Sequence, residues 1–108
     1  MYIKTLLATL FLVHAVMGAL RCYDCDSTKG HANCQSGSGV TDEDMCPYPP
    51  KGGSRICLEY SENVNGSMKY VRQCDVAQGK SPCPSMKQTR KIIQCRDCTT
   101  HYCNKNPL

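Results

Sequence analysis

Cysteine is the residue type in this sequence with the greatest capacity for chemistry. Ten of the 108 residues are cysteine, and two pairs have the spacing of zinc knuckles and redox motifs, Cys22 with Cys25 and Cys95 with Cys98. Four thiolates at this spacing would hold a zinc ion in a reducing compartment. A thioredoxin-like role needs a strand–helix–strand setting, which the sequence does not predict. A third use, structural disulfides, depends on where the chain folds.

The first residues of the chain indicate its compartment. A short basic start precedes an apolar run over residues 6–16, and small residues follow at Gly18 and Ala19. The run is too short to cross a bilayer, which needs ~20 residues, and its layout is typical of a secretory signal peptide. We expect residues 1–19 to be that peptide, with cleavage after Gly18 or Ala19, and residues 20–108 to form one domain. In an oxidising lumen the cysteines favour disulfides over zinc.

The domain has few apolar side chains from which to build a core. Residues 20–108 contain only ten Leu, Ile, Val and Phe residues and no Trp. Ordering a chain costs roughly 1.5 kcal/mol per residue, which so small a core does not offset, so cross-links must decide whether it folds. Spacing alone does not choose the pairing. The cysteines are Cys22, Cys25, Cys34, Cys46, Cys57, Cys74, Cys83, Cys95, Cys98 and Cys103.

Short alternating runs between turn-forming residues predict antiparallel strands, hence a small disulfide-rich all-β fold. The clearest is a hairpin over Arg55–Cys74, because Asn65-Gly66 is a type I′ turn signal. Three favourable cross-strand pairs form in that register: Glu62–Lys69, Glu59–Arg72 and Tyr60–Val71. A one-residue slip would lose all three. Further strands are predicted at residues 21–23 and through residues 91–94, the latter in a second hairpin.

Both ends of the domain carry a family resemblance. The opening Leu20-Arg21-Cys22-Tyr23-Asp24-Cys25 and the terminal Cys103-Asn104 resemble the three-finger family, which includes lymphocyte-antigen-6 and urokinase-receptor-like domains and snake neurotoxins. The two residues that separate Cys95 from Cys98 make the chain similar to arthropod members. The resemblance implies a three-finger fold, in which three antiparallel β-hairpin loops extend from a five-disulfide knot. It places finger one at Cys25–Cys46, finger two at Arg55–Cys74 and finger three at Cys83–Cys95.

The resemblance also implies roles for individual residues. Asn104 would tie the C-terminal loop to the core by hydrogen bonds, which suits a side chain with two donors and an acceptor. The family pairing, carried onto this sequence, implies five bridges: Cys22–Cys57, Cys25–Cys34, Cys46–Cys74, Cys83–Cys95 and Cys98–Cys103.

Two modifications common in such proteins are read from short motifs. Asn65-Gly66-Ser67 is an N-glycosylation sequon, and a glycan there would shift the contact surface towards fingers one and three. Many relatives carry a glycolipid-anchor signal after the last bridge, whereas only residues 104–108 follow it here, too few for that signal. We therefore expect a soluble, secreted, extracellular monomer without a membrane anchor.

Charge is unevenly distributed along the domain. Residues 20–62 hold seven acids and four bases, whereas residues 63–108 hold eight bases and two acids. Lys87, Arg90 and Lys91 cluster on the expected finger three and are candidates for docking on an acidic receptor surface. Residues 42–44 form an acidic patch. The formal net charge of +4 is too mild to indicate nucleic-acid binding.

No motif in the sequence indicates catalysis. There is no nucleophile elbow and no phosphate-binding loop, and His31 and His101 are expected to be exposed loop residues without a metal or catalytic role. We expect no enzyme and no cofactor. The resemblance implies a soluble ligand or modulator of a cell-surface receptor or ion channel, nicotinic-type receptors first. The alternatives are a toxin-like or defence effector and a reproductive-fluid or matrix-binding protein.

Overall fold

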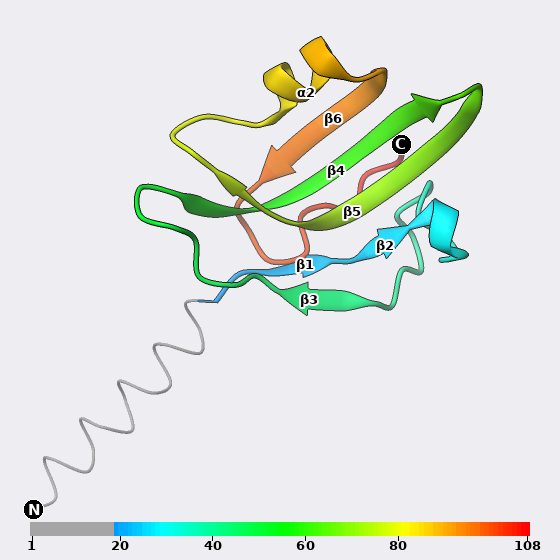
Figure 1. The fold of residues 1–108 in the computed structure, drawn as a ribbon. Helices are drawn as coiled ribbons and strands as arrows, with labels where there is room; N and C mark the ends of the chain where they lie inside the picture. The colour runs from blue at the N-terminus through cyan, green and yellow to red at the C-terminus, as the bar shows by residue number, and fades with distance from the viewer. Residues whose placement is uncertain (1–18) are drawn as a thin grey trace, which may run out of the picture.

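The computed structural model describes residues 19–108 of the chain. The expected signal peptide, residues 1–19, lies outside the described residues except for Ala19. Within residues 19–108 the chain forms a small, mostly β structure with two antiparallel sheets and five disulfide bonds (Figure 1). The small, disulfide-rich β class expected from the composition is thus confirmed.

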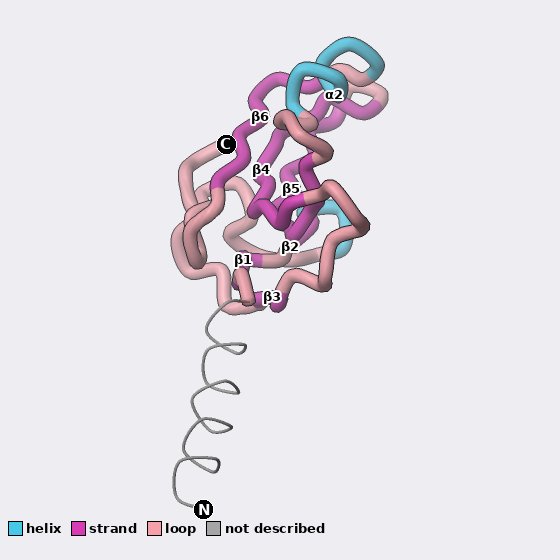
Figure 2. The backbone as a smooth tube through the Cα atoms, turned by 90° about the vertical axis from the view of Figure 1, so that its left-hand side faces the viewer, coloured by secondary structure: helices cyan, strands magenta, loops and turns pink. Residues whose placement is uncertain are grey.

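The described strands are β1 (Arg21–Tyr23), β2 (Cys25–Asp26), β3 (Glu43–Met45), β4 (Ser54–Val64), β5 (Ser67–Ala77) and β6 (Ile92–Cys98), and the two short helices are η1 (Ser27–Lys29) and α2 (Cys83–Thr89). The first strand occupies the predicted residues 21–23. One sheet has two strands, β1 and β3, and the other has four, in the order β2-β5-β4-β6. Helix α2 and the β1–β3 sheet lie at opposite ends of the described structure in both views (Figures 1 and 2).

The long hairpin β4–β5 has the predicted register. Its three expected cross-strand pairs are all present: Glu62–Lys69, Glu59–Arg72 and Tyr60–Val71. Asn65 and Gly66 both have positive φ, 53° and 88°, which is the backbone that a type I′ turn requires. The Asn63 side chain accepts the Gly66 N–H at 2.9 Å and closes the turn.

The expected hairpin in finger three is wrong. Residues 83–89 form helix α2 instead, and β6 pairs with β4 rather than with a partner strand of its own. Pro84 is tolerated in the first turn of a helix, and Met, Lys and Gln are good helix formers. Met86 then packs against the cluster of Leu58, Tyr60 and Val71, so burial of one side chain favours the helix.

Finger one is not a separate hairpin either. Its strand β2 pairs with β5, and β3 pairs with β1, while η1 and a long loop occupy residues 27–42. Gly30, Asn33, Gly37 and Gly39 all have positive φ in this segment, which strands do not accommodate. The fold is therefore one long hairpin with β2 and β6 paired to its two edges, the finger-one loop on one face and helix α2 on the other.

The two faces of the β4–β5 hairpin are packed differently. One face carries Leu58, Tyr60 and Val71 against α2. The other carries Glu59 and Arg72, both buried, against the finger-one loop and the C-terminal segment. A second apolar cluster, where the two sheets meet, consists mainly of cystine sulfur around Leu20.

Each of the ten cysteines in the described residues is bridged. The pairs are the same as those that the family resemblance implies: Cys22–Cys57, Cys25–Cys34, Cys46–Cys74, Cys83–Cys95 and Cys98–Cys103. Among the described residues, no helix has both the length and the apolar character that crossing a bilayer requires.

Candidate functional site

A buried ion pair lies at the centre of the hairpin face that finger one covers. Arg72 and Glu59 are 0% and 1% exposed, and the guanidinium donates to the carboxylate. Its remaining donors reach four backbone carbonyl oxygens at 2.8–3.1 Å: those of Cys34, Gln35, Asn104 and Asn106. Burial lowers the pKa of Arg72 from its ordinary value, and the charge of Glu59 opposes that shift. All five N–H donors of the guanidinium therefore have acceptors.

The carboxylate of Glu59 is equally well satisfied. It accepts from Arg96 Nε at 3.1 Å, from the Asn106 side chain at 2.8 Å and from the Asn106 backbone N–H at 3.2 Å, besides Arg72. We call Glu59, Arg72, Arg96 and Asn106 the Glu59–Arg72 centre. Because its donors and lone pairs are used internally, the centre positions segments of the chain and leaves little capacity for proton transfer.

Asn104 and Gly37 extend this arrangement towards the C-terminal segment. The buried Asn104 side chain accepts the Tyr23 N–H at 3.0 Å and donates to the carbonyl oxygens of Tyr23 and Leu58 at 3.0 and 3.2 Å. This is the tying role that the resemblance implies for Asn104. At Gly37 a Cβ would lie 2.5 Å from the Lys105 carbonyl oxygen, so only glycine fits between the two segments.

The three basic residues proposed for partner binding are not equivalent. Arg90 is engaged within the chain: it donates to Glu62 at 2.6 and 3.0 Å and to the Tyr60 hydroxyl at 3.3 Å. The hydrogen bond from Arg90 holds the pKa of Glu62 below its ordinary value, and the same contact raises the pKa of Arg90. Lys87 and Lys91 are exposed. All three residues are thus on the surface, but Arg90 is paired with Glu62, a contact that joins the end of α2 to β4.

Lys91 lies beside the tip of the long hairpin. The Asn63 N–H donates to the Lys91 carbonyl oxygen at 2.9 Å, two residues before the sequon asparagine. Asn65 itself is exposed at the tip of the hairpin. Two exposed apolar side chains flank it, Val64 at 41% and Met68 at 39%. Lys91 and the tip of the hairpin are therefore neighbours, and Lys87 lies in the helix that comes before Lys91.

The acidic patch lies at the other end of the molecule. Glu43 and Asp44 belong to β3, and all three side chains of residues 42–44 are exposed. Arg21 of β1 contacts Glu43 at 3.5 Å. Figures 1 and 2 place β3 opposite α2, so the acidic and basic patches are separated along the molecule.

His31 and His101 are exposed, and each accepts a hydrogen bond from a backbone N–H. The Nδ1 atom of His31 accepts the Asp26 N–H at 2.9 Å, and that of His101 accepts the Arg21 N–H at 3.1 Å. His31 also lines an open groove of about 520 Å³ between finger one and the C-terminal segment. The sequence did not predict this groove, because its walls are far apart in the chain. They are Ser27, His31, Asn33, Cys34, Gln35, Ser36, Tyr70, Pro107 and Leu108.

A second surface feature that the sequence did not predict lies beside β4. Tyr48 is 90% exposed, and the guanidinium of Arg55 stacks over its ring at 4.4 Å from the centroid. Arg55 also donates to the Pro47 carbonyl oxygen at 3.1 Å. An open groove adjoins this stack, lined by Leu20, Tyr48, Pro49, Pro50, Gly53, Arg55 and Thr99.

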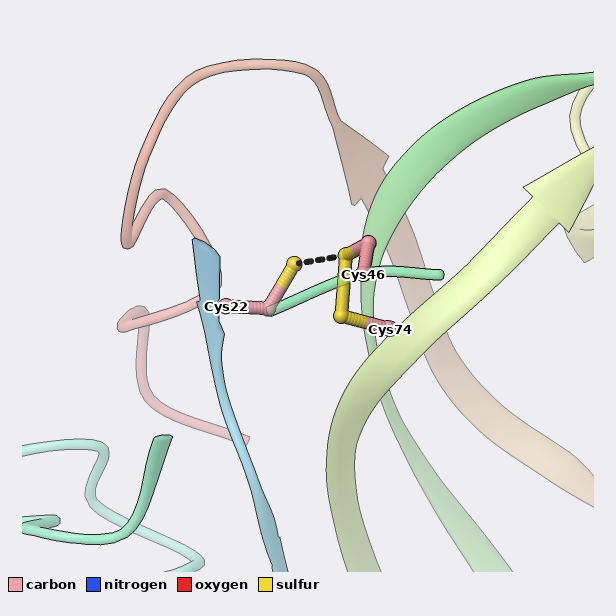
Figure 3. A group of neighbouring side chains, drawn as sticks. All are labelled: Cys22, Cys46 and Cys74. Carbon is pink, nitrogen blue, oxygen red and sulfur yellow. Dashed lines mark hydrogen bonds between the residues drawn. A yellow bond between two sulfur atoms is a disulfide. The ribbon is translucent and has the colours of Figure 1, made fainter. Parts of the chain in front are cut away.

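Three cysteine sulfurs gather where the two sheets meet. The Sγ atoms of Cys22, Cys46 and Cys74 lie within 4.8 Å of one another, and those of Cys22 and Cys46 are 3.3 Å apart (Figure 3). All three belong to disulfides, and a disulfide sulfur is not the thiolate that zinc binds. Cys25, from the knuckle spacing, is paired with Cys34 rather than with a second knuckle.

The comparisons with known proteins add no relative. A scan against models of protein families, a search of curated proteins and a search of solved structures each gave no significant match to this chain.

Proposed function

We propose that this chain is a secreted, non-enzymatic interaction module of the three-finger kind, acting as a soluble ligand or modulator of a cell-surface receptor or ion channel. Two features support the membership: the five bridges follow the pairing that the resemblance implies, and Asn104 ties the terminal loop to the core. Fingers one and three depart from simple hairpins. The secreted setting rests on the N-terminal sequence and on the wholly bridged cysteines.

The observation that carries the proposal is the cationic surface formed by Lys87 of α2 and by Lys91, which precedes β6. Both side chains are exposed. The Cys83–Cys95 disulfide joins α2 to β6, so the backbone that carries the two lysines would lose little freedom on binding. A cationic surface suits an acidic protein surface, and nicotinic-type receptors are the first candidates by resemblance.

Proximity labelling on live cells tests the partner. The oxidised protein carries a labelling enzyme, and the variant K87E/K91E is compared with the wild type and with the control K29E/K80E, which changes charge equally at two other exposed lysines. We expect the wild type to enrich specific surface proteins, less so at higher salt. K87E/K91E should lose that enrichment, and K29E/K80E should keep it.

The outcome that contradicts the proposal is equally defined. If both variants label the same surface proteins as the wild type, the α2 surface is not the contact. If the wild type enriches no surface protein in any cell line that carries nicotinic-type or other acidic receptors, the receptor assignment fails.

The secretory origin is tested separately. Expression of the full chain in cultured animal cells should give a protein in the medium that begins at Ala19 or Leu20. A mass loss on treatment with peptide N-glycosidase should disappear in N65Q and in S67A. Retention in the cytosol with Met1 in place would contradict secretion, whatever the partner.

A further inference from the structure

Four cysteines at the junction of the two sheets lie close enough together to be paired in two ways. In the observed bridges, Cys22 of β1 joins Cys57 of β4, and Cys46, which follows β3, joins Cys74 of β5. Both bridges therefore run between the two sheets. The same four residues are also neighbours within each sheet, because Cys57 faces Cys74 directly in the β4–β5 register and the sulfurs of Cys22 and Cys46 are 3.3 Å apart (Figure 3).

We propose that these four cysteines form a thiol-catalysed disulfide switch between the observed pairs and a second form with Cys22–Cys46 and Cys57–Cys74. Residues directly opposite in an antiparallel pair have Cα atoms about 4.5–5.5 Å apart, which lies within the ~4.4–6.8 Å that a disulfide spans. The sulfurs of Cys22 and Cys46 need to approach by about 1.3 Å to reach bonding distance. The strand pairings stay as they are in both forms.

The exchange requires a small thiol as catalyst and no net oxidant. Cys74 is half-buried, whereas Cys22, Cys46 and Cys57 are each no more than 4% exposed, so the thiolate attacks Cys74. The Cys46–Cys74 bond breaks, Cys74 carries the small thiol as a mixed disulfide, and Cys46 leaves as a thiolate. Cys46 then attacks the sulfur of Cys22, and the Cys22–Cys57 bond breaks.

The last step returns the catalyst. The Cys57 thiolate attacks the mixed disulfide on Cys74, forms the Cys57–Cys74 bond and expels the small thiol. Electrons and protons balance, since five disulfides are present before and after. The rearranged protein has lost both disulfide links between the β1–β3 sheet and the long hairpin, so non-covalent contacts, such as those of Asn104 with Tyr23 and Leu58, hold the acidic end to the hairpin.

The first test is disulfide mapping of the wild-type protein. The folded protein is incubated in a buffer of reduced and oxidised glutathione, quenched with acid, alkylated and digested without reduction. We expect peptides linked through Cys22–Cys46 and Cys57–Cys74 to rise together with time, without a matching rise in alkylated cysteine and with the other three bridges intact. Glutathione on Cys74 without these peptides, or scrambling that includes the other bridges equally, would overturn the proposal.

A pair of variants tests the second form directly. In C22S/C46S the remaining Cys57 and Cys74 should join, giving a protein with four disulfides and no free thiol. The matched control C22S/C74S leaves Cys46 and Cys57, which neither pairing joins, and should show two free thiols. A folded C22S/C46S protein, judged by dispersed amide resonances, with free thiols at Cys57 and Cys74 would refute the switch. If either variant does not fold, the wild-type map decides.

Discussion

At the scale of single residues, the Glu59–Arg72 pair differs most from its expected role. The sequence indicated an opposite-charge cross-strand pair, and such pairs contribute roughly 0.2–1 kcal/mol. In the fold the pair is buried, and Arg72 holds finger one and the C-terminal segment through four carbonyl oxygens. Removal of Arg72 would leave the buried Glu59 with Arg96 as its cationic partner and would take the Arg72 donors from four backbone carbonyl oxygens, which is a far larger effect.

The variant R72M should therefore lower the free energy of unfolding by about 3–5 kcal/mol. Denaturant unfolding with all bridges intact measures it. The control K69M removes a partly exposed cation that lies 3.9 Å from Asp26 and should cost under about 1 kcal/mol. Equal losses for the two variants would show that the Glu59–Arg72 centre does not stabilise the fold.

The Glu62–Arg90 contact predicts a dependence on pH. The pKa of Glu62 is below its ordinary value in the folded chain because Arg90 donates to it. Its stabilising contribution is therefore present above the pKa of the unfolded state and is lost as the pH falls through the lower folded pKa. In E62Q we expect lower stability at pH 7 and a shallower loss of stability below about pH 4.

Thermal unfolding between pH 3 and 7 tests this expectation. The control E43Q removes an exposed carboxylate that lies 3.5 Å from Arg21, and it should lower the stability at pH 7 by under about 1 kcal/mol. An E62Q curve parallel to the wild type at all pH values would contradict the assignment.

At the scale of elements, the sequence predicted the parts of the structure that neighbouring residues determine. It did not predict the parts that depend on contacts between residues far apart in the chain. The Asn65-Gly66 turn and the charges on both sides of it determine the hairpin register, because all the interacting residues lie within one short segment. Helix α2 was missed because Cys83 and Met86 are its side chains in the core cluster, and two such positions make no recognisable apolar stripe. The contacts of Arg96 and Asn106 with Glu59 join residues far apart in sequence, so no spacing pattern shows them.

The finger-one loop offers a matched pair of glycine variants. Gly37 and Gly30 have nearly the same φ, 77° and 78°, but only at Gly37 would a Cβ collide with backbone, at the Lys105 carbonyl. We expect G30A to lose about 1 kcal/mol of stability from its left-handed backbone and G37A to lose about 2–3 kcal/mol. Chemical denaturation of both proteins compares them. A G37A variant as stable as G30A would mean that the C-terminal segment does not pack there.

At the scale of the whole molecule, cystine takes the place of an apolar interior. One of the two core clusters consists of Leu20 and cysteine side chains. The Cys22–Cys57 disulfide closes a loop of 35 residues. By restricting the unfolded chain it raises the free energy of the unfolded state by about 4 kcal/mol. The ten Leu, Ile and Val side chains of residues 20–108 supply about 1.5–3 kcal/mol each where fully buried, well below the cost of ordering the chain, so the bridges decide whether it folds.

The reduced chain should accordingly be unfolded at neutral pH. We expect a phosphine reductant to collapse the amide dispersion in a proton–nitrogen correlation spectrum, and the intact mass to rise by ten hydrogens as five bridges open. The oxidised protein at the same temperature is the control. Retained dispersion in the fully reduced chain would show that packing alone specifies the fold.

The acidic strand β3 and the basic residues of α2 lie at opposite ends of the molecule (Figure 1). Such a separation gives the protein an electric dipole along its length. Near a negatively charged cell surface the field would turn the molecule before contact, with the helix leading and β3 trailing. Orientation during such an approach would add to the overall attraction that a formal net charge of +4 gives.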